Sequence, residues 1–201
     1  QFSQLATPAS AADHVRLGRA HLELHSAAAL AQADAQFQSA LALDANHAEA
    51  NFLKALTLFA TLEQGTAFQT ALNGLGIVKG DLYQGGYSIP TDGNGDMIPT
   101  PGTHTSSGID YLINTVLPVL TTIRTHLDKA ASPAFATSLS DSESAASYVE
   151  IDAGDVLGIR AATYALEAII RLLQTYDAGV SVADLITENN QATLTAESLF
   201  D

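Results

Sequence analysis

Apolar residues recur at helical spacing through most of the chain, and the longest such segment lies between residues 107 and 129. Its apolar positions are Ile109, Leu112, Ile113, Val116, Leu117, Leu120, Ile123 and Leu127. The spacing predicts one helix from about Ser107 to Lys129, with Pro118 inside it. Because proline lacks a backbone N–H and its ring crowds the carbonyl four residues earlier, we expect a kink near Asn114, with helix on both sides.

A second long apolar segment covers residues 152–176. Apolar residues lie on nearly all its sides, and its charges Arg160, Glu167 and Arg171 fall on one narrow stripe. This pattern predicts a central helix that is covered on most sides. Shorter helices are expected from Thr66 to about Gly74 or Gly76 and within residues 181–188.

The segment between the two long helices lacks helical periodicity. Residues 131–147 are rich in Ser and Ala, which predicts a surface connection. The sequence YVEID at 148–152 is consistent with a short extended segment.

In the first third of the chain, the spacing of apolar residues predicts three helices between Ser10 and about Leu62. Ser10 and Ser26 are suited to accept hydrogen bonds from the free backbone N–H groups at the start of the first and second helices. The third helix follows Asn46. The connection at residues 44–46 is short, which favours antiparallel neighbours.

The first two of these helices carry a characteristic series of residues along the chain. The series is Leu17-Gly18, Ala33, Phe37, Ala40-Leu41 and Leu43-Asp44. The order resembles the tetratricopeptide repeat, whose small residues let paired helices pack closely. Residues 47–59, HAEANFLKALTLF, are similar to the first helix of a second copy, with Ala55 at the close-contact position. The resemblance implies a helix-pair scaffold for interactions. An ordinary alanine-rich helical bundle is the alternative.

The sequence therefore predicts an all-α fold, an antiparallel helical array or bundle in a single domain of residues 1–201. Its parts are tetratricopeptide-like helices at 10–62, a long loop at 77–106 and C-terminal helices at 107–188.

Acidic residues outnumber basic ones by 22 to 8, which gives a formal net charge of −14. Such a chain repels phosphate backbones and anionic membrane surfaces, so we expect neither nucleic acid nor lipid surfaces as partners. No apolar run reaches the eighteen or so residues that a membrane span needs. The chain contains no cysteine, so neither disulfides nor thiolate metal sites can form. It begins at Gln1 without a basic and apolar leader, and we expect a mature secreted chain.

The long loop contains alternating oxygen-bearing residues. Asp92, Asn94 and Asp96 occupy positions 1, 3 and 5 of a tight glycine-containing loop, and the backbone carbonyl of Ile98 would take position 7. Alternate carboxylates and amides converge on one centre, which is the arrangement that Ca²⁺ prefers. The loop is similar to the calcium loops of EF-hands, dockerins and thrombospondin type 3 repeats. Position 12 is Thr103 rather than glutamate, so other residues must complete the shell.

Two further carboxylates are expected to complete this calcium site, Asp110 and Asp152. Asp110 is the nearest downstream carboxylate, and Asp152 lies in an acidic cluster with Glu150 and Asp155. Asp81 is another candidate. The alternative is a solvated Gly-Asn-Asp turn, with the acidic cluster capping the start of the following helix.

The other candidate chemistry is weaker. His21 and His25 are spaced to share one helix face, and His14 precedes His21 by seven residues, but no third zinc ligand is evident. The sequence has no nucleophile elbow, P-loop or dinucleotide fingerprint. We therefore expect no enzyme.

The combined features favour a secreted structural or interaction protein, a calcium-stabilised subunit of an extracellular filament or surface layer that forms homo-oligomers. A monomeric module that binds a peptide or glycan is the alternative, and an extracellular hydrolase with structural calcium is a third hypothesis.

Overall fold

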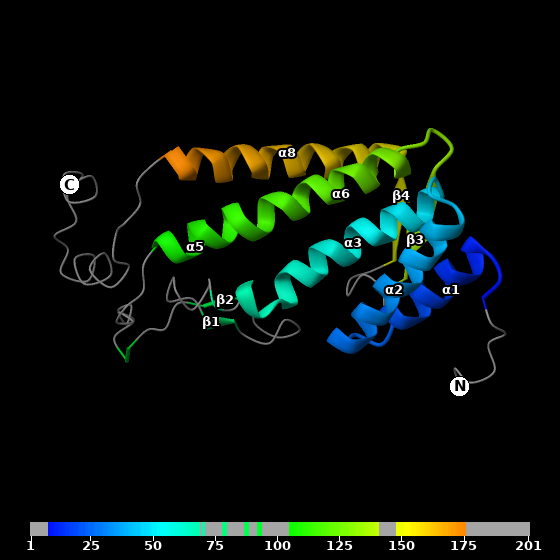
Figure 1. The fold of residues 1–201 in the computed structure, drawn as a ribbon, viewed down its shortest axis with the longest axis horizontal. Helices are drawn as coiled ribbons and strands as arrows, with labels where there is room; N and C mark the ends of the chain where they lie inside the picture. The colour runs from blue at the N-terminus through cyan, green and yellow to red at the C-terminus, as the bar shows by residue number, and fades with distance from the viewer. Residues whose placement is uncertain are drawn as a thin grey trace. The chain divides into compact units, whose positions relative to one another are not determined.

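The computed structural model describes residues 8–68, 70, 78–79, 87–88, 92–93, 105–140 and 148–175 (Figure 1). Most of these residues are helical, which confirms the all-α class in outline, and two small two-stranded antiparallel sheets are added. The internal contacts divide the chain into two compact units. Unit 1 comprises residues 1–64 and 118–167, and unit 2 comprises residues 65–117 and 168–201.

Unit 1 begins with helix α1 (Ala11–Leu22), whose start matches the sequence prediction. The side chain of Ser10 accepts a hydrogen bond from the backbone N–H of Asp13, and the Asp13 carboxylate accepts one from the N–H of Ser10. This reciprocal capping box satisfies two backbone donors at the helix start. The hydrogen bonds from Ser10 and from Arg16 lower the pKa of Asp13 to about 2.

Helix α2 (Ala27–Leu43) packs against α1 through a close contact between Gly18 and Phe37. Ser26 caps the start of α2 by accepting a hydrogen bond from the N–H of Ala29. Phe37 is fully buried, and a Cβ added to Gly18 would lie only 2.8 and 2.9 Å from Cζ and Cδ1 of its ring. The small residue at position 18 therefore lets the two helices approach. The wider tetratricopeptide-like arrangement stays a prediction.

Helix α3 (Ala48–Gln64) follows the short connection after Asp44 and supplies much of the core of unit 1. Phe52 and Leu53 are fully buried, as is Ala55 at its predicted close-contact position. Lys54 is also buried, although it is charged, because its ammonium group lies 2.6 Å from the carboxylate of Asp34 on α2.

Strands β3 (Ala136–Leu139) and β4 (Val149–Asp152) form an antiparallel pair beside these helices. The pairing aligns Thr137 with Ile151 and Ser138 with Glu150. The prediction of an extended segment at 148–152 is thus confirmed. The prediction of a plain surface connection at 131–147 is wrong for residues 136–139. They form a strand because they pair with residues ten to sixteen positions further along the chain, which local sequence does not reveal.

Helix α8 (Ala153–Thr175) starts directly after β4, and its first part belongs to unit 1. It is held to helix α6 (Leu117–Ala130) by two ion pairs, Arg124 to Glu167 at 2.6 Å and Arg160 to Asp128 at 2.5 Å. The guanidinium of Arg124 also lies 4.6 Å from the ring centroid of Tyr164, within the range of a cation–π contact.

The residues of α5 (Thr105–Tyr111), the π-helical turn η2 (Leu112–Val116) and α6 follow one another without a break. The prediction that the chain stays helical on both sides of Pro118 is therefore confirmed. The wider turn directly before Pro118 suits a residue that cannot donate a backbone hydrogen bond.

Unit 2 also contains a short strand pair, β1 (Val78–Lys79) with β2 (Tyr87–Ser88). The prediction of a long loop at 77–106 therefore needs correction, because these residues pair as strands and α5 begins at Thr105. The rings of Phe68 and Tyr111 lie 5.8 Å apart, and burial raises the pKa of the Tyr111 hydroxyl. The helix predicted at 181–188 lies outside the described residues. None of the described helices has the length and apolar character that crossing a membrane requires.

Candidate functional site

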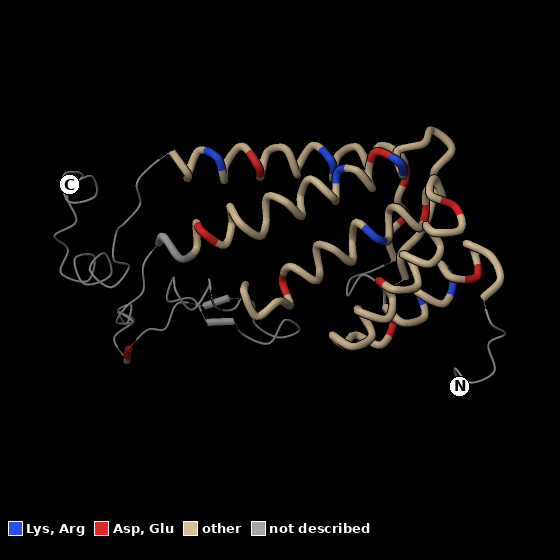
Figure 2. Tube along the Cα trace, viewed as in Figure 1, with Lys and Arg blue, Asp and Glu red and all other residues tan. Residues whose placement is uncertain are grey.

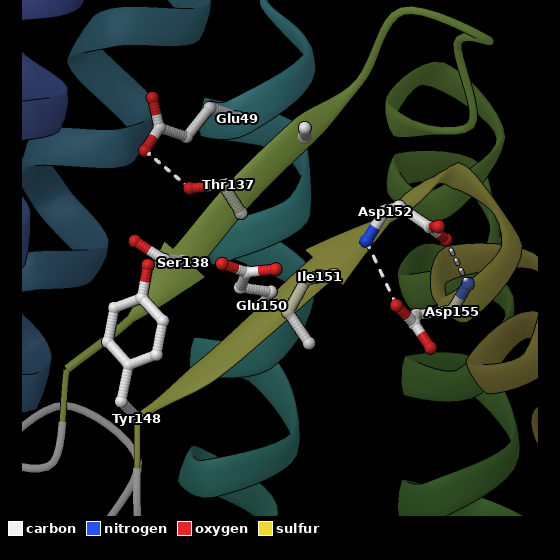
Figure 3. A pocket seen from close by; sticks show the side chains of 9 residues that line it. Glu49, Thr137, Ser138, Tyr148, Glu150, Ile151, Asp152 and Asp155 are labelled. Atoms are coloured by element: carbon white, nitrogen blue, oxygen red, sulfur yellow. Dashed lines mark hydrogen bonds between the residues drawn. The ribbon is translucent and has the colours of Figure 1, made fainter.

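An acidic cleft of about 720 Å³ lies along the β3–β4 pair in unit 1 (Figure 3). Its carboxylates come from three elements: Glu49 from α3, Glu150 and Asp152 from β4, and Asp155 from α8. The exposed ring of Tyr148 lies at the same cleft. The cleft is therefore negatively charged and has one large aromatic surface.

Glu49 is tied into a hydrogen-bond network at one wall of the cleft. Its Oε1 lies 2.6 Å from a guanidinium nitrogen of Arg19 on α1 and accepts a hydrogen bond of 3.0 Å from the hydroxyl of Thr137 (Figure 3). Arg19 also donates to the hydroxyl of Thr137 and to the backbone carbonyl of Ser138. This network connects α1, α3 and β3 and holds Glu49 in one orientation.

Asp152 and Asp155 cap the start of α8 at the opposite wall. Oδ1 of Asp152 accepts hydrogen bonds from the backbone N–H groups of Gly154 and Asp155, at 2.7 and 3.1 Å. The carboxylate of Asp155 accepts one of 2.9 Å from the N–H of Asp152 (Figure 3). This geometry accounts for both carboxylates as helix caps, so the capping role weighed from the sequence is observed. Asp152 as a calcium ligand stays a prediction.

The other expected calcium ligands are only partly described. Asp92 lies in a described pair with Gly93, whereas Asn94, Asp96 and Ile98 lie outside the described residues. Asp110 is exposed on α5. Within the described ranges, no three His, Asp or Glu side chains come together to form a group that could hold a metal ion. Calcium binding by the loop stays a prediction.

The histidine pattern on α1 has a partner on the next helix. Nδ1 of His14 lies 2.7 Å from the side-chain oxygen of Gln36 on α2. This contact places His14 in the packing between two helices. In the parts of the chain that the structure describes, it has no neighbours that would make it a zinc ligand.

A buried polar cluster joins α2, α3 and α6. The hydroxyl of Thr57 donates to Asp34, the partner of Lys54, and Nδ1 of His126 lies 2.9 Å from the side-chain oxygen of Asn51. The amide nitrogen of Asn51 donates to two backbone carbonyls, so its oxygen faces His126 and requires a proton on Nδ1. Burial and the positive charges of Lys54 and Lys129 lower the pKa of His126, and only Asp34 opposes them.

Helix α8 carries a broad exposed apolar surface, which contradicts the prediction of a helix covered on most sides. Its buried residues Val156, Thr163 and Ile170 follow one another at intervals of seven and form one stripe. The large apolar residues away from this stripe are exposed by 38 to 57%: Leu157, Leu166, Ile169, Leu172 and Leu173. Small exposed residues lie between them, namely Gly158, Ala161, Ala162, Ala165 and Ala168. We call these ten residues the α8 face.

Charged residues are sparse on this helix, as Figure 2 shows by the few coloured bands on α8. Arg160 and Glu167 lie near the buried stripe and form ion pairs with α6, and Asp155 precedes the face. Between Leu157 and Leu173 the exposed charged residue is Arg171, which follows Tyr164 by seven residues at the edge of the face. The α8 face is therefore uncharged.

The sequence analysis did not predict two of these features, the hydrogen-bond network around Glu49 and the buried ion pair of Lys54. The network of Arg19, Glu49 and Thr137 joins residues that are 30 to 118 positions apart, and no local pattern indicates it. Lys54 did carry a signal, because a lysine inside the apolar run NFLKALTLF must lie at the surface or meet a carboxylate.

Comparison of the chain with protein families, with curated proteins and with solved structures finds no match.

Proposed function

We propose that this protein is a non-catalytic structural or interaction protein that self-associates through the α8 face. The observation that supports the proposal is the continuous apolar surface on α8. Complete burial of one Leu or Ile side chain contributes about 1.5–3 kcal/mol, so covering five that are about half exposed would contribute roughly 1 kcal/mol for each. Soluble monomers rarely expose large contiguous apolar patches, whereas interaction surfaces do.

The charge distribution is consistent with contact at this face. Two copies with a net charge of −14 repel each other, and a contact that brought carboxylates together would increase this repulsion. The uncharged α8 face avoids that cost. Because salt screens the remaining long-range repulsion, association should become stronger as the ionic strength rises.

The helix pairs of the first third support the same class of function. If α1, α2 and α3 form a tetratricopeptide-like scaffold, they provide packing surfaces rather than a reaction centre. We propose an extracellular filament or surface layer as the larger assembly, which would need a further contact besides the α8 face.

Sedimentation velocity over a range of protein concentrations, at low and high salt, tests the proposal. We expect a mass that rises with concentration and with salt. Ile169→Glu, in the middle of the face, should give a monomer. Gln174→Glu is the matched control, because it adds the same charge to α8 but follows Glu167 by seven residues, on the side away from the face. A wild-type protein that stays monomeric under all conditions would show that the proposal is wrong.

A second candidate function is the binding of a basic peptide in the acidic cleft, as a monomeric module. Four carboxylates and the exposed ring of Tyr148 favour a ligand with Lys or Arg side chains. Titration with a lysine- and arginine-rich peptide should show salt-sensitive binding that Glu150→Gln weakens. The absence of binding at low salt would remove this candidate without affecting self-association.

A further inference from the structure

We propose that two copies of the α8 face pair antiparallel, with Ala165 of each copy at the centre of the contact. This inference rests on the proposed self-association and specifies its geometry. It follows from the distribution of large and small residues along the face, and from the absence of charged residues among the ten that form it.

The two halves of the face differ in side-chain size. Near its seam, the N-terminal half carries Gly158, Ala161 and Ala162, and the C-terminal half carries the larger Ile169 and Leu172 together with one small residue, Ala168. Leu157 is large but lies at the edge of the face, on the same side of the helix as Tyr164, which follows it by seven residues. The seam therefore changes from shallow to prominent along the helix.

An antiparallel partner matches this change in size. With Ala165 opposite Ala165, Leu172 of each copy lies opposite Gly158 of the other, and Ile169 lies opposite Ala161. A Cβ placed on Gly158 would meet no atom within 4 Å, so this position is open to a side chain of a second copy. A parallel pair would instead place large residues against large ones and leave a gap along the small half. Large side chains inserted between small ones give the close packing of helix pairs.

Symmetry and electrostatics favour the same arrangement. A two-fold axis through the contact makes the face its own complement, as an isologous interface requires, and the association closes at two copies. The dipoles of two antiparallel helices attract each other. The arrangement also brings no carboxylates of the two acidic chains together at the seam, because the face holds none.

The size of the contact determines how it must be measured. A 23-residue helix is about 34 Å long, and a strip of that length and about 10 Å width falls short of the roughly 800 Å² per partner in stable complexes. We therefore expect reversible association that grows with concentration, and covalent capture is the suitable readout.

The absence of cysteine allows single thiols to be placed at will. We would make Gly158→Cys and Leu172→Cys, give one of them a tag that changes its mass, and cross-link them singly and as an equal mixture with a short bis-maleimide. The antiparallel pair predicts mainly the mixed product, from Cys at 158 of one copy to Cys at 172 of the other. Ala165→Cys should cross-link with itself. Gln174→Cys, on the side away from the face, is the control that reports random collisions. Circular dichroism would confirm that each variant is folded.

The outcomes separate the two proposals. A mixed product well above the Gln174→Cys background supports the antiparallel pair. Products of each variant with itself and little mixed product would show a parallel pair, which overturns this inference but leaves self-association through α8 intact. Background cross-linking at every α8 position, with dimers in sedimentation, would place the contact on another surface and overturn the use of α8 altogether. Monomers in sedimentation would overturn the proposed function itself.

Discussion

The contact between Gly18 and Phe37 makes the strongest stability prediction for this protein. Substituting Gly18 by Ala adds one methyl group at a point where Cζ and Cδ1 of Phe37 would lie 2.8 and 2.9 Å away. Carbon atoms pack best at about 3.5–4.0 Å, so the methyl group or the ring must move. The ring is fully buried, which leaves it no solvent-filled space to enter.

Two opposing terms set the size of the effect. Alanine favours a helix interior over glycine by about 1 kcal/mol, whereas overpacking a core costs about 1–3 kcal/mol or more. Because the clash involves a buried ring, we expect the overpacking cost to dominate and Gly18→Ala to destabilise the protein by about 1 kcal/mol or more. Gly158→Ala is the matched control on α8, because a Cβ at that position meets no atom within 4 Å. This control should stabilise the helix by up to about 1 kcal/mol.

Urea unfolding followed by circular dichroism measures both variants against the wild type. The protein concentration should be low and constant, since Gly158 lies on the α8 face. A double-mutant cycle with Phe37→Leu then identifies the cause, because the added methyl group should be better tolerated once the ring is gone. We expect a coupling energy of about 1 kcal/mol or more between positions 18 and 37. Equal effects of Gly18→Ala and Gly158→Ala, or strict additivity in the cycle, would refute the reasoning.

Three further predictions follow from the buried polar cluster and from the sequence. The pKa of His126 is lowered in the folded state, so the stability that its neutral form contributes is present above the unfolded-state value of about 6.5 and is lost as the pH falls below it. The loss of stability between pH 7 and 5, measured by urea unfolding, should therefore be smaller in His126→Gln than in the wild type, and an equal loss in the two proteins would contradict this role of His126. Lys54→Met should lower the free energy of unfolding by about 2 kcal/mol, because Asp34 loses its charged partner, and adding Asp34→Leu to the same chain should recover part of this loss. If urea unfolding shows Lys54→Met to be as stable as the wild type, the inferred role of the pair is wrong. Calorimetric titration should detect one calcium site that Asp92→Ala removes and Asp44→Ala retains, and a wild-type chain that releases no heat and melts at the same temperature in calcium and in chelator would exclude the site.

The sequence determined the helices and their starts because those features depend on neighbours within a few residues. Ser10 and Ser26 cap helices as predicted, since a side-chain oxygen only has to reach backbone N–H groups two or three residues ahead. The helix through Pro118 was equally predictable, because its apolar positions recur with one period on both sides of the proline.

Tertiary structure alone decided the features that join distant residues. β3 is a strand because β4 provides its hydrogen bonds from ten to sixteen residues further along the chain, from Leu139 paired with Val149 to Ala136 paired with Asp152. The local sequence of β3 does not indicate this pairing. The cleft arose in the same way, because Glu49 and Thr137 meet only after α3 and β3 pack side by side.

Helix α8 shows the division between the two levels most clearly. Its sequence established that the helix is apolar on nearly all sides, which is a property of composition and period. Which of those sides is covered depends on the elements that pack against it. In the described structure only the stripe of Val156, Thr163 and Ile170 is buried, and the opposite side is exposed. An apolar pattern indicates that burying a surface lowers the free energy, but it does not specify which element or molecule packs against that surface.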